Sequence, residues 1–311
     1  MLKFQTYRNN YQNCYQLLLS SLLKRLDLNE KMYWYQSIPF YDSKEKKLFF
    51  SDYGDFKLSS IWKKYDNIKI NYIKQEEYEM FISNLIKHLK IRNIGIFIDL
   101  FFLPYSMYYL IRHDIHAIEI INYKKKTFII ADHYYNYYGT LKYSDLIKSL
   151  ISYKKIFSKK FSFFYIEETT PKIVNNEKEK LLINKHNNNL YDIFNFIKED
   201  ILSLSRCNNL KVSQEIGTKI YSYLKDFSGT QKMLYFFISE LINYDEKYNN
   251  FMIKEISYLY KESSENLNMI ANFLLKNIIK QNLNYPTEKI TYLLEKSLVN
   301  NLKIQELFRK L

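Results

Sequence analysis

The sequence contains few of the residues that interrupt secondary structure or cross-link a fold: its 311 residues include 5 Gly, 4 Pro and 2 Cys. Because only Cys14 and Cys207 are present, a disulfide framework is excluded and both thiols are available in a reducing compartment. No run approaches the roughly 18 apolar residues that a membrane-spanning helix requires. The first residues also lack the uninterrupted apolar core of a secretory signal. We therefore expect a cytoplasmic protein with no membrane span.

Several binding motifs are absent as well. The sequence has no CxxC or HExxH pattern, which argues against a zinc site, and no glycine-rich phosphate loop, which argues against nucleotide binding. We therefore expect no metal and no cofactor. The formal net charge of +13 favours anionic partners, although an AT-rich genome would produce the same Lys-, Asn- and Ile-rich composition. Because the lysines are spread along the chain, we expect no nucleic-acid partner.

The first part of the chain mixes helical and extended patterns, which predict an α+β fold. Hydrophobic residues make up 47% of the sequence, so a sizeable core is available. Helices are predicted from apolar residues at helical spacing, at 13–26, 58–65, 76–90 and 141–150. Strands are predicted at 94–103, 115–123, 127–131 and 161–167, with a further strand-like stretch that begins at Tyr72.

The second part of the chain is predicted to be helical throughout. A polar stretch at 169–189 is interpreted as a linker, which divides the chain into a domain at 1–168 and a helical domain at 190–311. Gly229 is expected just beyond a helix end, and Pro286 in a first helical turn. The individual helices are predicted at 213–227, 230–244, 248–261, 267–281 and 286–311.

Cys14 lies at the start of an apolar helical run and is the first candidate for chemistry. A free cysteine at such a place is most often a small buried apolar residue. A helix N-terminus and a neighbouring imidazolium would instead favour the thiolate, which is the nucleophilic form. The amides of Asn9, Asn10 and Gln12 precede it, and one of them could join the Cys14 backbone N–H as an oxyanion donor. The alternative is that these amides are helix caps and turn residues.

His116 and Asp132 supply the base and the carboxylate that a thiol nucleophile needs. They lie sixteen residues apart at the outer ends of two predicted strands, and a hairpin turn near Lys125 would bring them within side-chain reach. The alternative is a structural His–Asp pair across the strands. His113 and His133 flank the pair as alternative bases.

The residues around this pair resemble a known family. An Asn-Cys-Tyr-Gln element before a Leu-rich helix, an -LPY- element, an H-x-x-H that opens a strand and a strand that closes in Asp are all similar to the N-terminal family of butirosin biosynthesis protein H. The resemblance covers about residues 8–165 and extends to papain-like leader peptidases of bacteriocin exporters and to the closthioamide amide synthase. It is strongest in the segment GIFIDLFFLPYSMYYLIRHDIHAIEIINYKKKTFIIADHYYNYYGTL.

The resemblance implies a papain-like fold with an antiparallel sheet, in which Cys14 is the nucleophile, His116 the general base and acid, and Asp132 the orienting carboxylate. It also implies amide synthesis in secondary-metabolite or antibiotic biosynthesis: an acyl group leaves a phosphopantetheine thioester on an acidic carrier protein and passes to an amine. The family's oxyanion glutamine has no match at Arg8 or Asn9, so the oxyanion donor stays open. The alternatives are a cysteine peptidase or thioesterase with the same triad, and a non-catalytic basic interaction module.

Overall fold

A computed structural model describes residues 6–35, 39–42, 47–50, 55–167 and 190–311. The chain forms two compact units, a sheet unit of residues 1–30 and 67–171 and a helical unit of residues 31–66 and 172–311. The segment 31–66 therefore groups with the helical residues, whereas the sequence placed it in the first domain. The linker expected at 169–189 lies outside the described residues.

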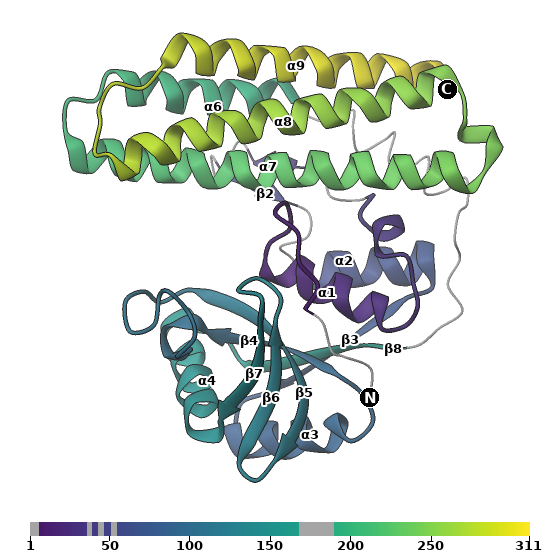
Figure 1. Cartoon of the computed structure of the whole chain (residues 1–311), viewed down its shortest axis with the longest axis vertical. Helices are drawn as coiled ribbons and strands as arrows, with labels where there is room; N and C mark the ends of the chain where they lie inside the picture. The colour runs from purple at the N-terminus through teal and green to yellow at the C-terminus, as the bar shows by residue number, and fades with distance from the viewer. Residues whose placement is uncertain (1–5, 36–38, 43–46, 51–54, 168–189) are drawn as a thin grey trace. The chain divides into compact units, whose positions relative to one another are not determined.

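The sheet unit is an α+β structure built on one antiparallel sheet of six strands in the order β3-β8-β4-β5-β6-β7 (Figure 1). Its helices are α1 (Cys14–Lys24), α3 (Tyr78–Leu89) and α4 (Tyr143–Phe157). Its strands are β3 (Lys69–Gln75), β4 (Ile94–Asp99), β5 (Ile115–Lys124), β6 (Thr127–Asp132), β7 (Tyr137–Lys142) and β8 (Phe161–Glu167). The predicted α+β class of this part is confirmed.

Both faces of the central strands are buried, which explains why β4 and β8 read as continuous apolar runs. On one face, Phe81 of α3 and Leu146 of α4 join a core with alternate strand residues such as Ile96. On the other face, the Tyr15 ring of α1 lies 5.5 Å from the Phe164 ring. Gly95 faces that same ring, and an added Cβ would lie 2.4 Å from it, so the strand needs glycine there.

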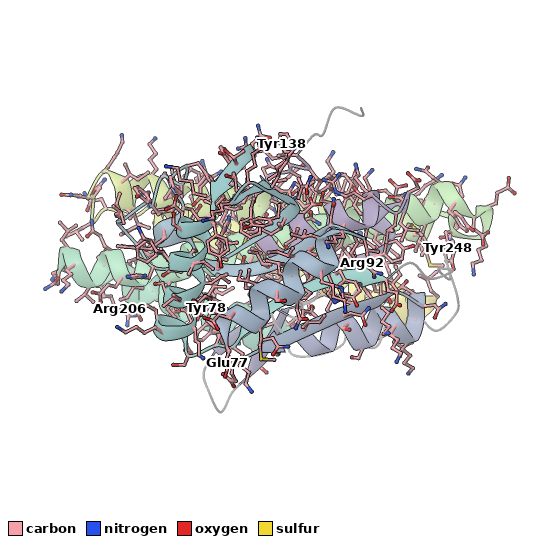
Figure 2. All side chains as sticks on the ribbon, turned by 90° about the horizontal axis from the view of Figure 1, so that it is seen from below. Glu77, Tyr78, Arg92, Tyr138, Arg206 and Tyr248 are labelled. Carbon is pink, nitrogen blue, oxygen red and sulfur yellow. The ribbon has the colours of Figure 1, made fainter. Side chains whose placement is uncertain are left out.

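Helix α3 contacts the sheet along its length and just past its C-terminal end. Figure 2 shows the side chains of Glu77 and Tyr78 at the start of this helix and of Arg92 just beyond its end. The Arg92 guanidinium lies 4.3 Å from the centre of the Tyr165 ring of β8. This cation–π contact and the apolar face of the helix both hold α3 against the sheet.

The end of one strand and the presence of another differ from the prediction. The strand predicted at 94–103 ends at Asp99, because the Asp99 carboxylate accepts a hydrogen bond from the backbone N–H of Phe101 and starts a 3-10 turn over Leu100–Phe102. Strand β7 was missed, since its run of Tyr, Gly and Thr has no apolar alternation. As a result α4 starts at Tyr143, two residues later than predicted, and continues to Phe157.

The helical unit contains four long helices that lie side by side (Figure 1). They are α6 (Leu190–Ser205), α7 (Leu210–Tyr244), α8 (Phe251–Ile279) and α9 (Thr287–Lys310). The same unit holds strands β1 (Pro39–Asp42) and β2 (Lys47–Phe50), helix α2 (Asp55–Ile61) and a π-helical turn at Trp62–Asp66. The helical character predicted for the second part of the chain is confirmed in residues 190–311.

The predicted breaks inside α7 and α8 were wrong. Gly229 is buried within α7 and ends no helix. The adjacent Ser228 hydroxyl donates to the Ser264 carbonyl of α8 at 2.8 Å, and Asn301 of α9 donates to the Ser263 hydroxyl at 2.9 Å. Small polar residues therefore mark close contacts between helices here, where the sequence pattern suggested helix ends.

Candidate functional site

Cys14 is the first residue of α1, and the residues around it fix this position. The Asn13 side chain accepts from the backbone N–H of Gln16 at 2.9 Å, and the Gln16 side chain accepts from the backbone N–H of Asn13 at 3.0 Å. This reciprocal capping box starts the helix at Cys14. The half-buried sulfur thus lies in the first helical turn, where unpaired backbone N–H groups favour a negative charge.

The hairpin of β5 and β6 brings His116 and Asp132 together, as the spacing predicted. His116 Nε2 lies 2.7 Å from Asp132 Oδ2, and both side chains are almost fully buried. The two residues are not directly opposite one another, because the register pairs Glu119 with Ala131. The next pair in the same register is residue 118 with Asp132. His116 lies two residues before 118 on the same face of the sheet, so its imidazole reaches the Asp132 carboxylate diagonally.

Four hydrogen bonds hold the Asp132 carboxylate in place. Its Oδ2 also accepts from the Tyr105 hydroxyl at 3.1 Å, and its Oδ1 accepts from the backbone N–H groups of Tyr134 and Tyr135 at 3.0 and 3.1 Å. Burial raises the pKa of Asp132, but His116 and these donors outweigh burial and hold the pKa below its usual range. Asp132 is therefore a fixed anion that orients the imidazole.

Cys14 also affects His116, because its sulfur is close enough to help raise the pKa of the imidazole. Because Nε2 faces Asp132, the nitrogen left for the Cys14 sulfur is Nδ1. Burial lowers the pKa of His116, but the Asp132 carboxylate and the Cys14 thiolate outweigh burial and raise it to about 10. In the sheet unit the imidazole of His116 therefore lies between the Cys14 sulfur and the Asp132 carboxylate. A cysteine nucleophile, its base and its orienting carboxylate have this arrangement.

The other histidines near this site have partners of their own. His113 Nδ1 lies 2.6 Å from Asp99, and His133 Nε2 lies 2.9 Å from Glu119. Asp99 is the last residue of β4, and its carboxylate also accepts a hydrogen bond from the Ser152 hydroxyl of α4 at 2.6 Å. In the described residues, His116 is therefore the histidine that joins Cys14 to a carboxylate.

The three oxyanion candidates lie in the turn before Cys14. Asn9 donates from its amide to Gln12 Oε1 at 2.9 Å and accepts from the Gln12 backbone N–H at 2.9 Å, so its side chain shapes the turn. Gln12 is buried, and its Oε1 also accepts from the Ser20 hydroxyl at 3.1 Å. Asn10 is exposed. Which donor faces an oxyanion stays a prediction, together with the catalytic roles of the three central residues.

Two residues around the site, the half-buried Tyr105 and the buried Glu119, were not singled out from the sequence. Tyr105, which donates to Asp132, is the tyrosine of the -LPY- element, and its ring stacks on that of Tyr137 at 4.0 Å. Glu119 is fully buried within the apolar run of β5. A charged residue in the middle of such a strand was the available signal, because a buried carboxylate requires partners.

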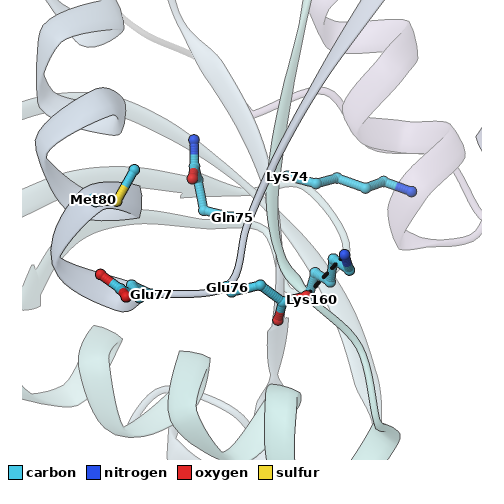
Figure 3. Close-up of a pocket in the computed structure, with 6 residues that line it drawn as sticks. All are labelled: Lys74, Gln75, Glu76, Glu77, Met80 and Lys160. Carbon is cyan, nitrogen blue, oxygen red and sulfur yellow. Dashed lines mark ion pairs between the residues drawn. The ribbon is translucent and has the colours of Figure 1, made fainter.

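A surface hollow of about 410 Å³ lies elsewhere on the sheet unit, where β3 leads into α3 near the start of β8 (Figure 3). Its lining includes the Lys160–Glu76 ion pair at 2.8 Å. It is lined by Lys74, Gln75, Glu76, Glu77, Met80 and Lys160, which include neither a cysteine nor a histidine. The candidate chemistry therefore belongs to the group around Cys14.

Comparison with known proteins adds no family assignment. No family model matches the chain, and no curated protein matches it. Across the residues that the structure covers, no helix is long and apolar enough to cross a membrane. Within the same residues, no cluster of three or more His, Cys, Asp or Glu side chains is placed to bind a metal ion.

The interaction of Cys14 with His116 predicts how Cys14 alkylation depends on pH. Because the imidazole stays protonated below about pH 10, a cation faces the sulfur throughout the neutral range. Between about pH 8 and 6 we expect the iodoacetamide rate at Cys14 to fall less than about threefold. An ordinary thiol, whose pKa is about 8.5, loses on the order of 100-fold over that interval.

The measurement is peptide mapping of alkylated protein against a cysteine-containing reference peptide. The His116→Ala variant is the control, and its Cys14 rate should follow the reference peptide because the facing cation is gone. A wild-type Cys14 profile parallel to that of the peptide would contradict an ion pair between Cys14 and His116.

Proposed function

We propose that this chain is a papain-like, cysteine-dependent acyltransferase that moves an acyl group from a carrier-protein thioester through Cys14 to an amine. The observation that supports this most is the buried His116, whose Nε2 lies 2.7 Å from Asp132 and whose pKa is raised by both Asp132 and Cys14. A fully buried imidazole between a thiol and a carboxylate fits a group that carries a proton between successive steps.

The reaction follows from the protonation states of this group. The Cys14 thiolate attacks the thioester carbonyl carbon, the carbon–sulfur bond to the carrier breaks, and His116 gives its proton to the leaving thiolate. Neutral His116 then takes a proton from the amine as the amine nitrogen attacks the acyl-Cys14 carbonyl. The carbon–sulfur bond to Cys14 breaks, the amide leaves, and the thiolate–imidazolium pair is restored. Asp132 keeps the imidazole oriented through both halves and stays ionised.

The choice of thioester and amine as substrates is supported by the sequence resemblance described above. The net charge of +13 also suits an acidic carrier protein, because opposite charge speeds the encounter of two proteins. Such a reaction requires neither a metal nor a further cofactor, and the phosphopantetheine arm belongs to the donor. A place in secondary-metabolite assembly is part of the same proposal.

Product analysis separates transfer from hydrolysis. We expect an acidic carrier protein loaded with an octanoyl thioester to acylate Cys14, and added butylamine to convert this adduct to the octanoyl amide. Chromatography with mass detection measures both the amide and free octanoic acid, with Cys14→Ala as the control.

Amide that forms only with intact Cys14 supports the proposal. Free acid as the sole product at saturating amine would contradict transfer and indicate a thioesterase or peptidase with the same triad. Neither an adduct nor a product would contradict an acyl-enzyme from such donors.

A further inference from the structure

A second group of polar side chains surrounds the buried Glu119, on the face of β5 opposite to that of the candidate base. Glu119 is fully buried, and its two oxygens accept from Arg25 Nε at 2.7 Å and from an Arg25 terminal nitrogen at 3.0 Å. Asn93 donates to it at 2.6 Å, His133 at 2.9 Å and the Ser21 hydroxyl at 3.4 Å. We call these five residues the Glu119 cluster.

The Glu119 cluster holds the nucleophile segment on both sides of Cys14. Ser21 lies in the second half of α1 and Arg25 caps its C-terminal end, so Glu119 fixes the far end of the helix. His133 Nδ1 accepts a hydrogen bond at 3.0 Å from the backbone N–H of Tyr7, which lies before the helix. The chain on either side of Cys14 is therefore tied to the same hairpin.

The hydrogen-bond roles in the cluster are fixed by these contacts. Because His133 Nδ1 accepts from a backbone N–H, the ring proton lies on Nε2 and is donated to Glu119. Burial raises the pKa of Glu119, but its bonds to His133 and Arg25 outweigh burial and hold the pKa below its usual range. The cluster thus pairs the buried carboxylate with the Arg25 cation and with three further hydrogen-bond donors.

Strands β5 and β6 position Glu119 and His133 of this cluster as well as the candidate catalytic pair. Glu119 follows His116 by three residues on β5, so the two point to opposite faces, and His133 directly follows Asp132 at the end of β6. A shift of the hairpin relative to α1 would therefore change the distance between the Cys14 sulfur and the imidazole. A misplacement of about 1 Å in such a site costs on the order of 100-fold in rate.

We propose that Glu119 and His133 are positioning residues, which hold Cys14 close to His116 by fixing the chain before and after it to the β5–β6 hairpin. This role rests on the proposed function for its effect on turnover. Its effect on the Cys14–His116 pair is independent of any substrate.

The test is Glu119→Gln, which keeps the size of the side chain and removes the charge that pairs with Arg25. We expect acyl transfer to fall by roughly 10- to 100-fold. We also expect the alkylation rate of Cys14 near pH 6 to fall by at least about tenfold in folded protein, because the sulfur loses its facing cation. Circular dichroism and thermal unfolding establish that the variant is folded.

Asp99→Asn is the matched control. Asp99 is equally buried in the same sheet and is also paired with a histidine, His113 at 2.6 Å, but it does not contact the segment around Cys14 in the described structure. A merely structural Glu119 would lower the melting temperature as this control does and leave Cys14 alkylation unchanged. Wild-type alkylation in folded Glu119→Gln would overturn the proposal.

A second variant covers failure of Glu119→Gln to fold. His133→Phe keeps an aromatic ring and removes both the donor to Glu119 and the acceptor for the Tyr7 backbone N–H. We expect a loss in the same direction, at least about threefold in Cys14 alkylation near pH 6. An unchanged profile in this variant would equally overturn the positioning role. If wild-type protein transfers no acyl group but both variants lose alkylation, the proposed function fails while the positioning role stands.

Discussion

Replacing Cys14 by Ala is expected to abolish the acyl-enzyme and to lower turnover by at least about 10⁴-fold. The Cys14 sulfur is the only protein atom in the proposed route that bonds to the acyl carbon, and neither His116 nor Asp132 can replace it as the nucleophile. Cys14 is half-buried at the first position of α1, where alanine is tolerated, so the fold should persist. Intact-protein mass spectrometry measures the adduct, and product formation measures turnover.

Cys207 supplies the matched control for this substitution. It is also half-buried, but its sulfur contacts the Asn209 carbonyl at 3.3 Å in the connection between α6 and α7. Cys207→Ala should therefore keep both the adduct and the turnover. Full activity in Cys14→Ala would instead identify the chain as a non-catalytic module in which Cys14 only packs.

Replacing Asp132 by Asn is expected to lower turnover by about 10²- to 10⁴-fold while the protein stays folded. An amide at this position keeps an acceptor oxygen for its neighbours but removes the charge that helps raise the pKa of His116 to about 10. That pKa should therefore fall, and the imidazolium should be lost at a lower pH than in the wild type. The pH dependence of Cys14 alkylation, measured beside the turnover rate, detects this change directly.

Asp99 and Asp114, two other carboxylates near the hairpin, serve as comparisons for Asp132→Asn. Asp99 is bound by His113 and Ser152, and Asp114 forms an exposed ion pair with Arg112 at 3.0 Å. Asp114→Asn should leave turnover unchanged, and Asp99→Asn should act on stability alone. Normal turnover in Asp132→Asn would mean that a different carboxylate orients the imidazole.

The parts of the site that depend on local sequence could be predicted. The helix start follows from the polar residues before Cys14, and the hairpin follows from two apolar strands around a lysine turn. Both features depend on residues that are close in the chain, so periodicity and turn chemistry are sufficient. The spacing of His116 and Asp132 was informative because one hairpin sets it.

The contacts that bridge distant segments could not be predicted in the same way. Glu119 bonds to Arg25, which is 94 residues away, and no local pattern specifies that pairing. The β-bulge between Ile120 and Asn122 also shifts the hairpin register, so the paired positions differ from those expected for a regular hairpin. Glu119 was visible only as a charge inside an apolar strand, and its partners required the fold.

In the helical unit, too, contacts between distant segments could not be predicted from the local sequence. Ser263 and Asn266 lie between the helices predicted at 248–261 and 267–281, yet they are buried in the middle of α8. A buried hydroxyl is stable there because a neighbouring helix supplies its partner, as Asn301 does for Ser263. Without that neighbour, a buried polar position and an exposed break have the same sequence pattern.

Successive side chains along β6 point to opposite faces of the sheet, so the number of residues in this strand determines which face each side chain occupies. Asp132 and His133 are adjacent in the chain but serve opposite faces of the sheet, each with a fixed partner on β5. Deleting one residue between Thr127 and Asp132 would exchange their faces, leaving His116 beside an imidazole and Glu119 beside a carboxylate. Natural variation in this strand should therefore conserve its length, or change it by two residues at a time.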